Sequence, residues 1–261
     1  MPTASTDGTD LYYDASGPED AETVVFVNEA GLGGWLWGWQ HAALTGSFRT
    51  VVWDLRGTGR SDAPEGPYDL ETLVEDLQAI FRAVEARRVH LIGAGLGGAV
   101  ALVAARRSSR VRSLCLFGTA LTGSAFELAE LWAPPTDRDA LRQSLSRALS
   151  PTFVETHPDV VDGIVEWRAD GDADEAGFAA QLAALDAYDA SEWAYEVTVP
   201  TLVVHGTADD LVSPDAGQTL AEAIPKGTYE PLEGSGHLCF VERSRVVNDR
   251  LLGRLESHAG K

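Results

Sequence analysis

The stretch HLIGAGLGGAVAL, residues 90–102, joins an apolar run to a glycine-rich corner and then to small residues with helical spacing. Gly93, Gly95 and Gly98 have the spacing G-x-G-x-x-G, which is typical of dinucleotide-binding loops. Residues 93–97 also have the form G-x-S-x-G, with Gly95 at the central position that this motif gives to serine. Both motifs need a strand before the corner and a helix after it, so the local pattern fits either one. The rest of the chain must decide between the two interpretations.

The dinucleotide interpretation fails further along the chain. A dinucleotide-binding domain carries an acidic residue about 20 residues beyond the motif, at the end of the next strand, to hold a ribose hydroxyl. Here the next apolar run ends in Leu116-Phe117-Gly118-Thr119, which contains no carboxylate. The motif also follows several earlier strand-like runs, whereas such a domain usually carries it on the first strand. We therefore favour the second interpretation.

Apolar runs typical of strands alternate with helical patterns along the chain. The runs cover Val24–Val27, Thr50–Trp53, Val89–Ile92, Val111–Phe117, Thr201–His205 and Thr228–Leu232. Asp69 is placed to cap a helix that carries Leu73 and Leu77 on one stripe, and residues 246–255 predict a last helix. The alternation predicts an α/β fold with a mostly parallel sheet and helices on both faces. We expect both ends, MPTAS and SHAGK, to be loose.

Residues 121–195 break this alternation. They are helical in character and rich in Ala, Asp, Glu and Trp, with prolines as punctuation. We interpret them as an inserted helical cap on a core formed by residues 1–120 and 196–261. A chain of 261 residues suits one such α/β domain with an insertion.

Acidic residues exceed basic residues by a wide margin. The chain has 40 Asp and Glu against 20 Lys and Arg, which gives a formal net charge of −20. Such a surface repels nucleic acid and anionic lipid, so we expect neither as a partner. The excess is spread over the whole chain and lysine is nearly absent, a pattern that resembles halophilic proteins kept soluble in concentrated salt.

No segment of the sequence indicates a membrane span, a secretion signal or a metal site. No apolar run approaches the length of about 18 residues that a membrane helix needs, and the N-terminal residues have no basic or apolar signal region. Cys115 and Cys239 are too few for a disulfide framework or a zinc cluster, and the histidines show no metal-type pairing. We expect a cytoplasmic protein with no cofactor and no metal, whose partner is a small-molecule substrate or ligand.

The interpretation of residues 93–97 as a G-x-S-x-G motif gains support from three other segments. LVVHGTADDLVSP, residues 202–214, places acids after an apolar strand, and LEGSGHLCFVE, residues 232–242, places a histidine in a glycine-rich loop. This nucleophile–acid–histidine order is that of the hydrolases that carry G-x-S-x-G. VVFVNEAGLGG, residues 24–34, puts a glycine-rich loop after an early strand, where an oxyanion-binding loop belongs.

On these residues the chain resembles the α/β-hydrolase superfamily over nearly its full length. Its N-terminal half resembles the 3-oxoadipate enol-lactonase group, through DLRGTGRSDAPEGPYDLETLVEDL at residues 54–77 and through Asn28, where many relatives carry the histidine of an HG motif. The GSGH segment at residues 234–237 adds to the resemblance. The resemblance implies an eight-stranded, mostly parallel sheet, a cap after the sixth strand and a pocket between them.

The resemblance also implies a site with one residue changed. Gly95 stands where the nucleophilic serine is expected, Asp209 matches the acid and His237 matches the base. The backbone N–H groups of Ala30 and Leu96 match the oxyanion donors, which do not depend on side chains.

Several neighbouring residues are candidates for the same pocket. Asn28, Glu29 and Trp35 lie in the oxyanion loop or its extension, and Asp210 is the alternative to the adjacent acid. No serine, threonine or cysteine lies between Val89 and Arg107 to replace the missing nucleophile.

Glu29 stands where relatives usually have glycine. We favour its interpretation as a surface-loop acid in an acid-rich protein; the alternative is a carboxylate that faces the pocket, acts as a base or repels anionic substrates. Gly95 relaxes the strain of the turn, which costs about 1–3 kcal/mol for a residue with a side chain. It is expected to leave a small void beside His237 that a water could fill.

Other polar and aromatic residues are expected to be structural. Asp54 and Arg56 tie the loop after their strand, and His205 is a core histidine. The two cysteines pack in the interior. The tryptophans of the oxyanion-loop extension and of the cap mostly pack, and one or two of them line the pocket mouth.

Three hypotheses follow. The first is a hydrolase of small esters or lactones that acts through His237, Asp209 and the backbone donors without a serine. The second is a non-catalytic relative that binds a small molecule or partner in the same pocket. The third is an ordinary serine esterase in which Gly95 is an engineered replacement.

Overall fold

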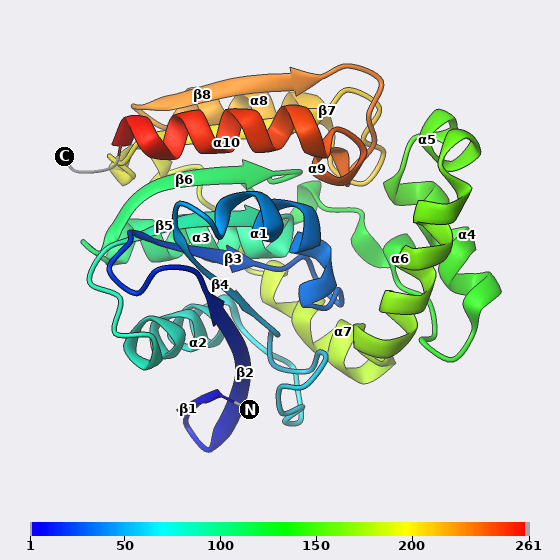
Figure 1. Ribbon diagram of the computed structural model, residues 1–261, viewed down its shortest axis with the longest axis horizontal. Helices are drawn as coiled ribbons and strands as arrows, with labels where there is room; N and C mark the ends of the chain where they lie inside the picture. The colour runs from blue at the N-terminus through cyan, green and yellow to red at the C-terminus, as the bar shows by residue number, and fades with distance from the viewer. Residues whose placement is uncertain (1, 259–261) are drawn as a thin grey trace.

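The computed structural model describes residues 2–258 and shows an eight-stranded sheet with helices on both faces (Figure 1). The strands are β1 (Thr3–Thr6), β2 (Thr9–Ser16), β3 (Thr23–Val27), β4 (Arg49–Trp53), β5 (Val89–Ala94), β6 (Val111–Phe117), β7 (Thr201–Gly206) and β8 (Gly227–Leu232). Their order in the sheet is β1-β2-β4-β3-β5-β6-β7-β8. Strands β1 and β2 pair antiparallel, and all pairs from β4 to β8 are parallel. The predicted fold class is confirmed.

The central strands are buried along their whole length. Every residue of β3, β5 and β7 is buried, as expected for strands covered by helices on both sides. Their continuous apolar runs are the reason that the sequence predicted them to within one or two residues.

The expectation of a loose N-terminus is wrong, because β1 pairs with β2 from Thr3 opposite Tyr12 to Thr6 opposite Thr9. These polar, partly exposed strands lack the apolar runs that identify the buried ones. At the other end, the last helix reaches His258, and the remainder of SHAGK lies outside the described residues.

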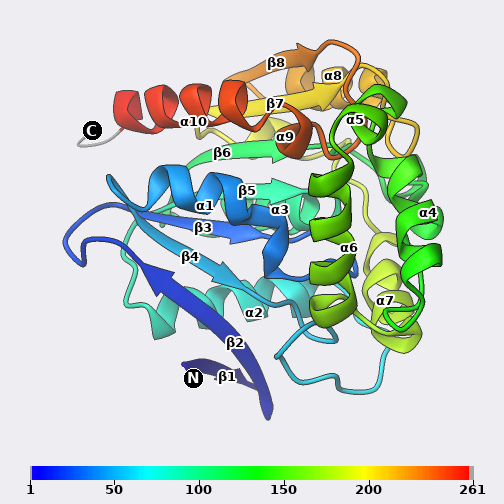
Figure 2. The ribbon, with the colours of Figure 1, turned by 45° about the vertical axis from the view of Figure 1, so that its right-hand side comes forward.

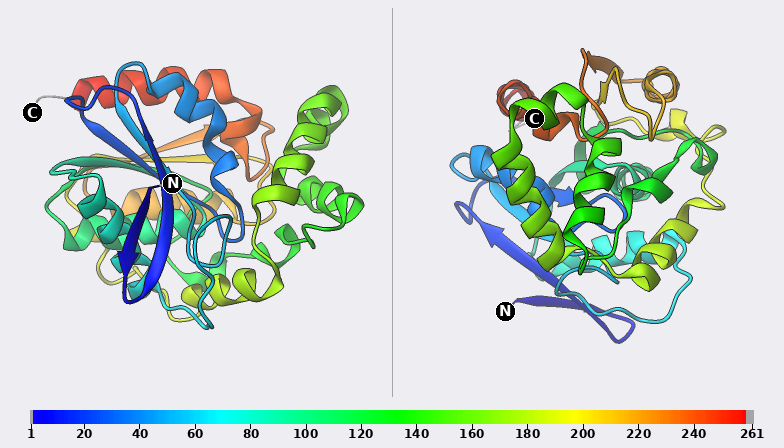
Figure 3. Two further views of the ribbon diagram at one scale, coloured as in Figure 1. Left: turned by 60° about the horizontal axis from the view of Figure 1, so that its bottom comes forward. Right: turned by 90° about the vertical axis from the view of Figure 1, so that its right-hand side faces the viewer.

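Helices of the core cover the two faces of the sheet unequally. They are η1 (Gly34–Trp37), α1 (Gly38–Leu44), α2 (Leu70–Ala83), α3 (Leu96–Arg107), α8 (Pro214–Ala223), α9 (Cys239–Glu242) and α10 (Ser244–His258). Helices α1 and α10 pack together on one face, whereas α2, α3 and α8 cover the other (Figure 3). Asp69 caps α2 as predicted, because its side chain accepts a hydrogen bond from the N–H of Thr72 at 2.7 Å.

A group of helices between β6 and β7 lies beyond the carboxyl ends of the strands (Figure 2). It contains η2 (Gly123–Ala125), η3 (Leu128–Leu131), α4 (Arg138–Ala148), α5 (Pro151–Thr156), α6 (Pro158–Gly171), α7 (Glu175–Leu182), η4 (Ala183–Leu185) and η5 (Ala194–Glu196). We refer to this group as the cap; its predicted limits at residues 121 and 195 stay a prediction. Of the helices that the structure describes, none is long and apolar enough to cross a membrane.

Hydrogen bonds fasten the cap to the loop that follows β3. Gln181 of α7 accepts from the N–H of Gly31 at 2.7 Å, and its own amide donates to the carbonyl of Arg56 at 2.7 Å. The N–H of Ala173 donates to the carbonyl of Gly31 at 2.8 Å. Gly31 has a φ of +72°, a conformation that glycine adopts without strain. The cap therefore holds the β3 loop from outside.

Asp54 and Arg56 have the structural roles expected of them. Asp54 accepts from the N–H groups of Gly34 and Arg60, both at 3.0 Å. The guanidinium of Arg56 donates to the buried carboxylate of Asp76 at 2.6 Å. Both side chains fix the loop after β4 against the rest of the core.

Candidate active site

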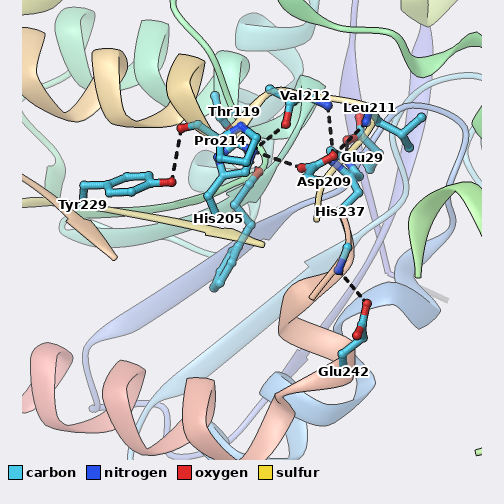
Figure 4. A network of polar contacts seen from close by, with 12 residues as sticks. Glu29, Thr119, His205, Asp209, Leu211, Val212, Pro214, Tyr229, His237 and Glu242 are labelled. Carbon is cyan, nitrogen blue, oxygen red and sulfur yellow. Dashed lines mark hydrogen bonds and ion pairs between the residues drawn. The ribbon is translucent and has the colours of Figure 1, made fainter. Parts of the chain in front are cut away.

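Three loops at the carboxyl edge of the sheet bring Glu29, Asp209 and His237 together (Figure 4). Glu29 follows β3, Asp209 follows β7, and His237 lies between β8 and α9. Carboxyl ends of parallel strands meet at one edge of a sheet, which explains how residues more than 200 positions apart come into contact.

Asp209 is the acid that faces the histidine. Its Oδ2 lies 2.8 Å from Nδ1 of His237, and its Oδ1 accepts from the N–H groups of Leu211 and Val212 at 2.9 and 3.0 Å. Asp210 is exposed, whereas this cluster is buried. Of the two acids considered from the sequence, Asp209 therefore has the geometry required.

A second imidazole contacts the same acid. Nε2 of His205 lies 3.0 Å from Oδ2 of Asp209 and donates to the carbonyl of Val212 at 2.8 Å. The sequence analysis treated His205 as a core histidine; it is fully buried, but it also orients Asp209. Its position four residues before Asp209 was the signal available in the sequence.

Glu29 occupies the centre of the site. Its side chain is fully buried, and its Oε2 lies 2.8 Å from Nε2 of His237. Its Oε1 accepts hydrogen bonds from the N–H of Ala30 at 2.7 Å and from the N–H of Leu96 at 2.9 Å. The favoured interpretation of Glu29 as a surface-loop acid is therefore wrong, because the carboxylate faces inward.

The buried carboxylate is compensated on both oxygens. Two backbone N–H groups bind one oxygen, and the imidazole binds the other. One of the N–H groups belongs to Leu96, the first residue of α3, and the start of a helix favours a negative charge. A buried charge that is paired and fully hydrogen-bonded is tolerated, whereas an unpaired one is not.

Gly95 lies at the sharp turn between β5 and α3. Its backbone has φ of 48° and ψ of −113°, and its N–H donates to the carbonyl of Phe117 at 2.9 Å. A Cβ atom on Gly95 would overlap Oε2 of Glu29. The expected void beside His237 is therefore wrong, since the carboxylate of Glu29 fills that space.

The charges around His237 favour its protonated form. Burial alone would lower the pKa of this imidazole, but the charges and hydrogen bonds of Asp209 and then of Glu29 outweigh burial and raise the pKa to about 10. Both ring nitrogens face carboxylate oxygens, which only accept, so both carry a proton. Burial alone would raise the pKa of Asp209, but His237 and His205 hold it well below its usual range.

The loop that carries His237 is fixed by Glu242 of α9. Its Oε1 accepts from the N–H of Gly236 and from the N–H of Ser150, both at 2.8 Å. Ser150 caps α5, so one carboxylate joins the histidine loop to the cap. The position of the imidazole therefore depends on both parts of the fold.

Two residues expected at the pocket do not join this cluster. The amide of Asn28 donates to the carbonyl of Trp53 at 3.0 Å and accepts from the indole of Trp37 at 2.9 Å, so it braces the loop. Trp35 donates its indole N–H to Asp172 at 2.7 Å and lines a separate cleft. Their side chains are occupied by these contacts and do not reach the histidine.

Neither a reactive thiol nor a metal-binding group is found among the described residues. Cys115 and Cys239 are buried as expected, and burial raises the pKa of each thiol, which keeps it protonated and unreactive. Across residues 2–258, no group of three or more His, Cys, Asp or Glu side chains is placed to hold a metal ion.

The chain belongs to the alpha/beta hydrolase fold family, whose model matches residues 24–244. The RutD protein of Variovorax paradoxus is 31% identical over 266 residues, which cover 93% of this chain and 94% of that protein. The 3-oxoadipate enol-lactonase 1 of Acinetobacter baylyi is 26% identical, over 90% of this chain and 89% of that one. The crystal structure of the enol-lactonase from Burkholderia xenovorans LB400 matches with a TM-score of 0.88 and 29% identity, and covers 98% of this chain and 100% of that one. The resemblance to enol-lactonases is thus confirmed at the level of family and fold.

The raised pKa of His237 predicts how stability depends on pH. A group whose pKa is about 10 in the folded protein and about 6.5 when unfolded stabilises the fold fully below pH 6.5. We expect the free energy of unfolding to fall by about 1.4 kcal/mol per pH unit between these values. Urea unfolding from pH 6 to pH 10 measures this slope.

The matched variant is Glu29→Gln, which removes one of the two negative charges. It should shorten the pH range over which the free energy of unfolding falls and lower the pH at which the His237 ring titrates in an NMR spectrum. Equal titration of His237 in the two proteins would show that Glu29 does not hold the imidazolium.

Proposed function

We propose that the protein hydrolyses small esters or lactones through Asp209, His237 and the N–H groups of Ala30 and Leu96, without a serine nucleophile. The carboxylate of Glu29 carries the proposal, because it has one oxygen on the two N–H groups and the other beside the imidazole. These are the places that a substrate carbonyl oxygen and an attacking water require. Glu29 thus resembles the carboxylate product of such a reaction.

We infer that Gly95 stands at the position where relatives of this fold carry their serine. Its positive φ and its place between a strand and a helix support the inference, since a nucleophile elbow has this geometry. With glycine there, the triad is incomplete, and the remaining acid and histidine have to activate water instead.

Substrate binding requires Glu29 to leave the two N–H groups. The carbonyl oxygen of the substrate takes the place of Oε1, and a water takes the place of Oε2. Loss of the nearby carboxylate lowers the pKa of His237, so the imidazole can lose a proton to solvent and then act as a base.

The reaction then follows general-base hydrolysis. His237 accepts a proton as the water oxygen bonds to the carbonyl carbon, and the two N–H groups stabilise the resulting oxyanion. The intermediate collapses, the bond to the alkoxide breaks, and the imidazolium returns its proton to the leaving oxygen. Backbone donors and binding alone give a rate of roughly 10³–10⁴ over water when a triad member is missing, so a slow enzyme is expected.

The overlap at Gly95 argues against an engineered replacement. Glu29 and a side chain at residue 95 compete for the same space. A serine esterase with only its serine removed would have no reason to carry a carboxylate there. The two residues are matched, which supports a natural departure from the usual site.

A second candidate function is binding without turnover. Binding without turnover is favoured by the structure with Glu29 in the site. There, both site N–H groups and both imidazole nitrogens already have partners. A pseudo-hydrolase would use the cap and loop surfaces and would leave Glu29 in place. Kinetics of site variants separate the two functions.

Hydrolysis of a panel of lactones and small esters tests the proposal. His237→Ala should lower turnover strongly, because the proposed mechanism assigns the proton of the attacking water to the imidazole. Glu29→Gln should raise kcat/KM by about a hundredfold, because a neutral amide binds the two N–H groups and the imidazole less strongly than a carboxylate, by about 1 kcal/mol for each of these three hydrogen bonds. Equal rates in the parent and His237→Ala would end the mechanism. Loss of activity in Glu29→Gln would instead show that the carboxylate takes part in the chemistry.

A pair of substitutions tests whether Gly95 and Glu29 are coupled. Gly95→Ser alone should destabilise the protein and give no esterase, because the new side chain overlaps Glu29. Gly95→Ser with Glu29→Gly should fold and cleave a chromogenic ester with a burst of acyl-enzyme formation. A burst in the single variant, with none in the double, would refute the coupling.

We further propose that the acid excess serves solubility in concentrated salt. A net charge of −20 repels itself, and salt screens that repulsion. The thermal midpoint of unfolding should therefore rise between dilute buffer and molar KCl, whereas sucrose at equal osmolality gives a control without screening. A midpoint that falls or stays constant in KCl would exclude a halophilic character.

A further inference from the structure

A cleft separate from the candidate active site lies between the cap and the core. Its volume is about 480 Å³, and its lining includes Tyr12 of β2, Trp35 of η1 and Trp167 of α6. Glu29, His237 and Gly95 are not among its lining residues. The cleft therefore belongs to the outer side of the β3 loop.

Aromatic side chains form much of this cleft. The ring of Trp35 is fixed by the hydrogen bond from its indole N–H to Asp172. Trp167 is 46% exposed, and its ring meets that of Trp39 at 5.8 Å and 70°. A second cavity of about 530 Å³ shares Trp35 and Trp167, so the aromatic surface continues beyond the cleft. A single exposed apolar side chain is ordinary, but a continuous aromatic surface that lines a cleft is typical of a ligand site.

Carboxylates accompany the rings. Asp54 is buried at the cleft, and Asp14 and Asp170 are exposed on its lining. Within residues 2–258, neither Asp14 nor Asp170 has a hydrogen bond or ion pair to another side chain. Negative charge beside aromatic faces is the combination that binds organic cations.

The protein itself supplies an example of this recognition. The guanidinium of Arg60 lies 3.5 Å from the centroid of the Tyr12 ring, and its Nε is 3.9 Å from Asp54. One end of the cleft therefore already holds a cation between a ring and a carboxylate. Trp35, Trp167 and Asp170 supply the same kinds of group elsewhere on the lining. His41 also lines the cleft, and burial lowers the pKa of its imidazole, which favours the neutral form.

We propose that the part of the cleft formed by Trp35, Trp167 and Asp170 binds a small quaternary ammonium cation. The cation lies against the indole rings and close to the carboxylates, where its charge is stabilised by both. This site is independent of the proposed hydrolysis, because it uses none of the residues of that mechanism.

Choline and its uncharged isostere 3,3-dimethylbutan-1-ol are the probes. Choline should quench tryptophan fluorescence saturably and bind about two- to thirtyfold more tightly than the alcohol, which corresponds to the roughly 0.5–2 kcal/mol that a cation gains over an indole. Trp167→Ala and Asp170→Asn should each weaken choline binding about fivefold in a calorimetric titration. Both residues are exposed on α6, so neither substitution should disturb folding. An unchanged unfolding midpoint checks this.

Asp159→Asn is the matched control, because it removes the same charge from the other end of α6. It should bind choline as the parent does. Equal affinity for choline and the alcohol, unchanged binding in both cleft variants, or no saturation up to ~50 mM choline would overturn the proposal. Lactone hydrolysis by the same variants should be unchanged, so failure of one proposal leaves the other intact.

Discussion

The hydrogen bonds of one carboxylate organise the centre of this molecule. Glu29 joins the loop after β3, the start of α3 and the histidine loop after β8, and it does so from a fully buried position. Each partner carries a positive or partly positive charge, so the carboxylate balances an imidazolium and a helix start together. Removal of the imidazole would leave the buried carboxylate without its countercharge. The carboxylate and the imidazole therefore stabilise each other in a site that has a glycine at its turn.

The fold was predictable from the sequence because the central strands are buried on both faces. Their continuous apolar runs identify them without further information, and the capping side chain of Asp69 identifies the start of α2. Strands β1 and β2 were missed because their half-exposed, polar residues lack that signal. Strands buried on both faces require apolar residues, which are visible in the sequence. Edge strands are held by backbone pairing, which leaves no such pattern.

Parts of the site were predictable for a different reason. Backbone N–H groups and the order of acid and histidine follow from motif spacing, and the structure brings Asp209, His237, Ala30 and Leu96 together accordingly. The orientation of Glu29 was not predictable from composition, since a loop acid in an acidic protein is ordinarily exposed. The usable signal was the pair Glu29 and Gly95, an acid in the glycine-rich loop after β3 and a glycine at the turn after β5, which lie side by side in the structure. Because Gly95 has no side chain, it leaves the space that the carboxylate of Glu29 occupies.

A tethered carboxylate has a consequence for what leaves the site. Ester hydrolysis produces an acid that would bind the same two N–H groups, and Glu29 competes with it at the high effective concentration of an attached group. Two like charges cannot share those donors in a buried space, so under the proposed hydrolysis the return of the side chain would expel the departing anion. Inhibition of such a reaction by its acid product would then be weak.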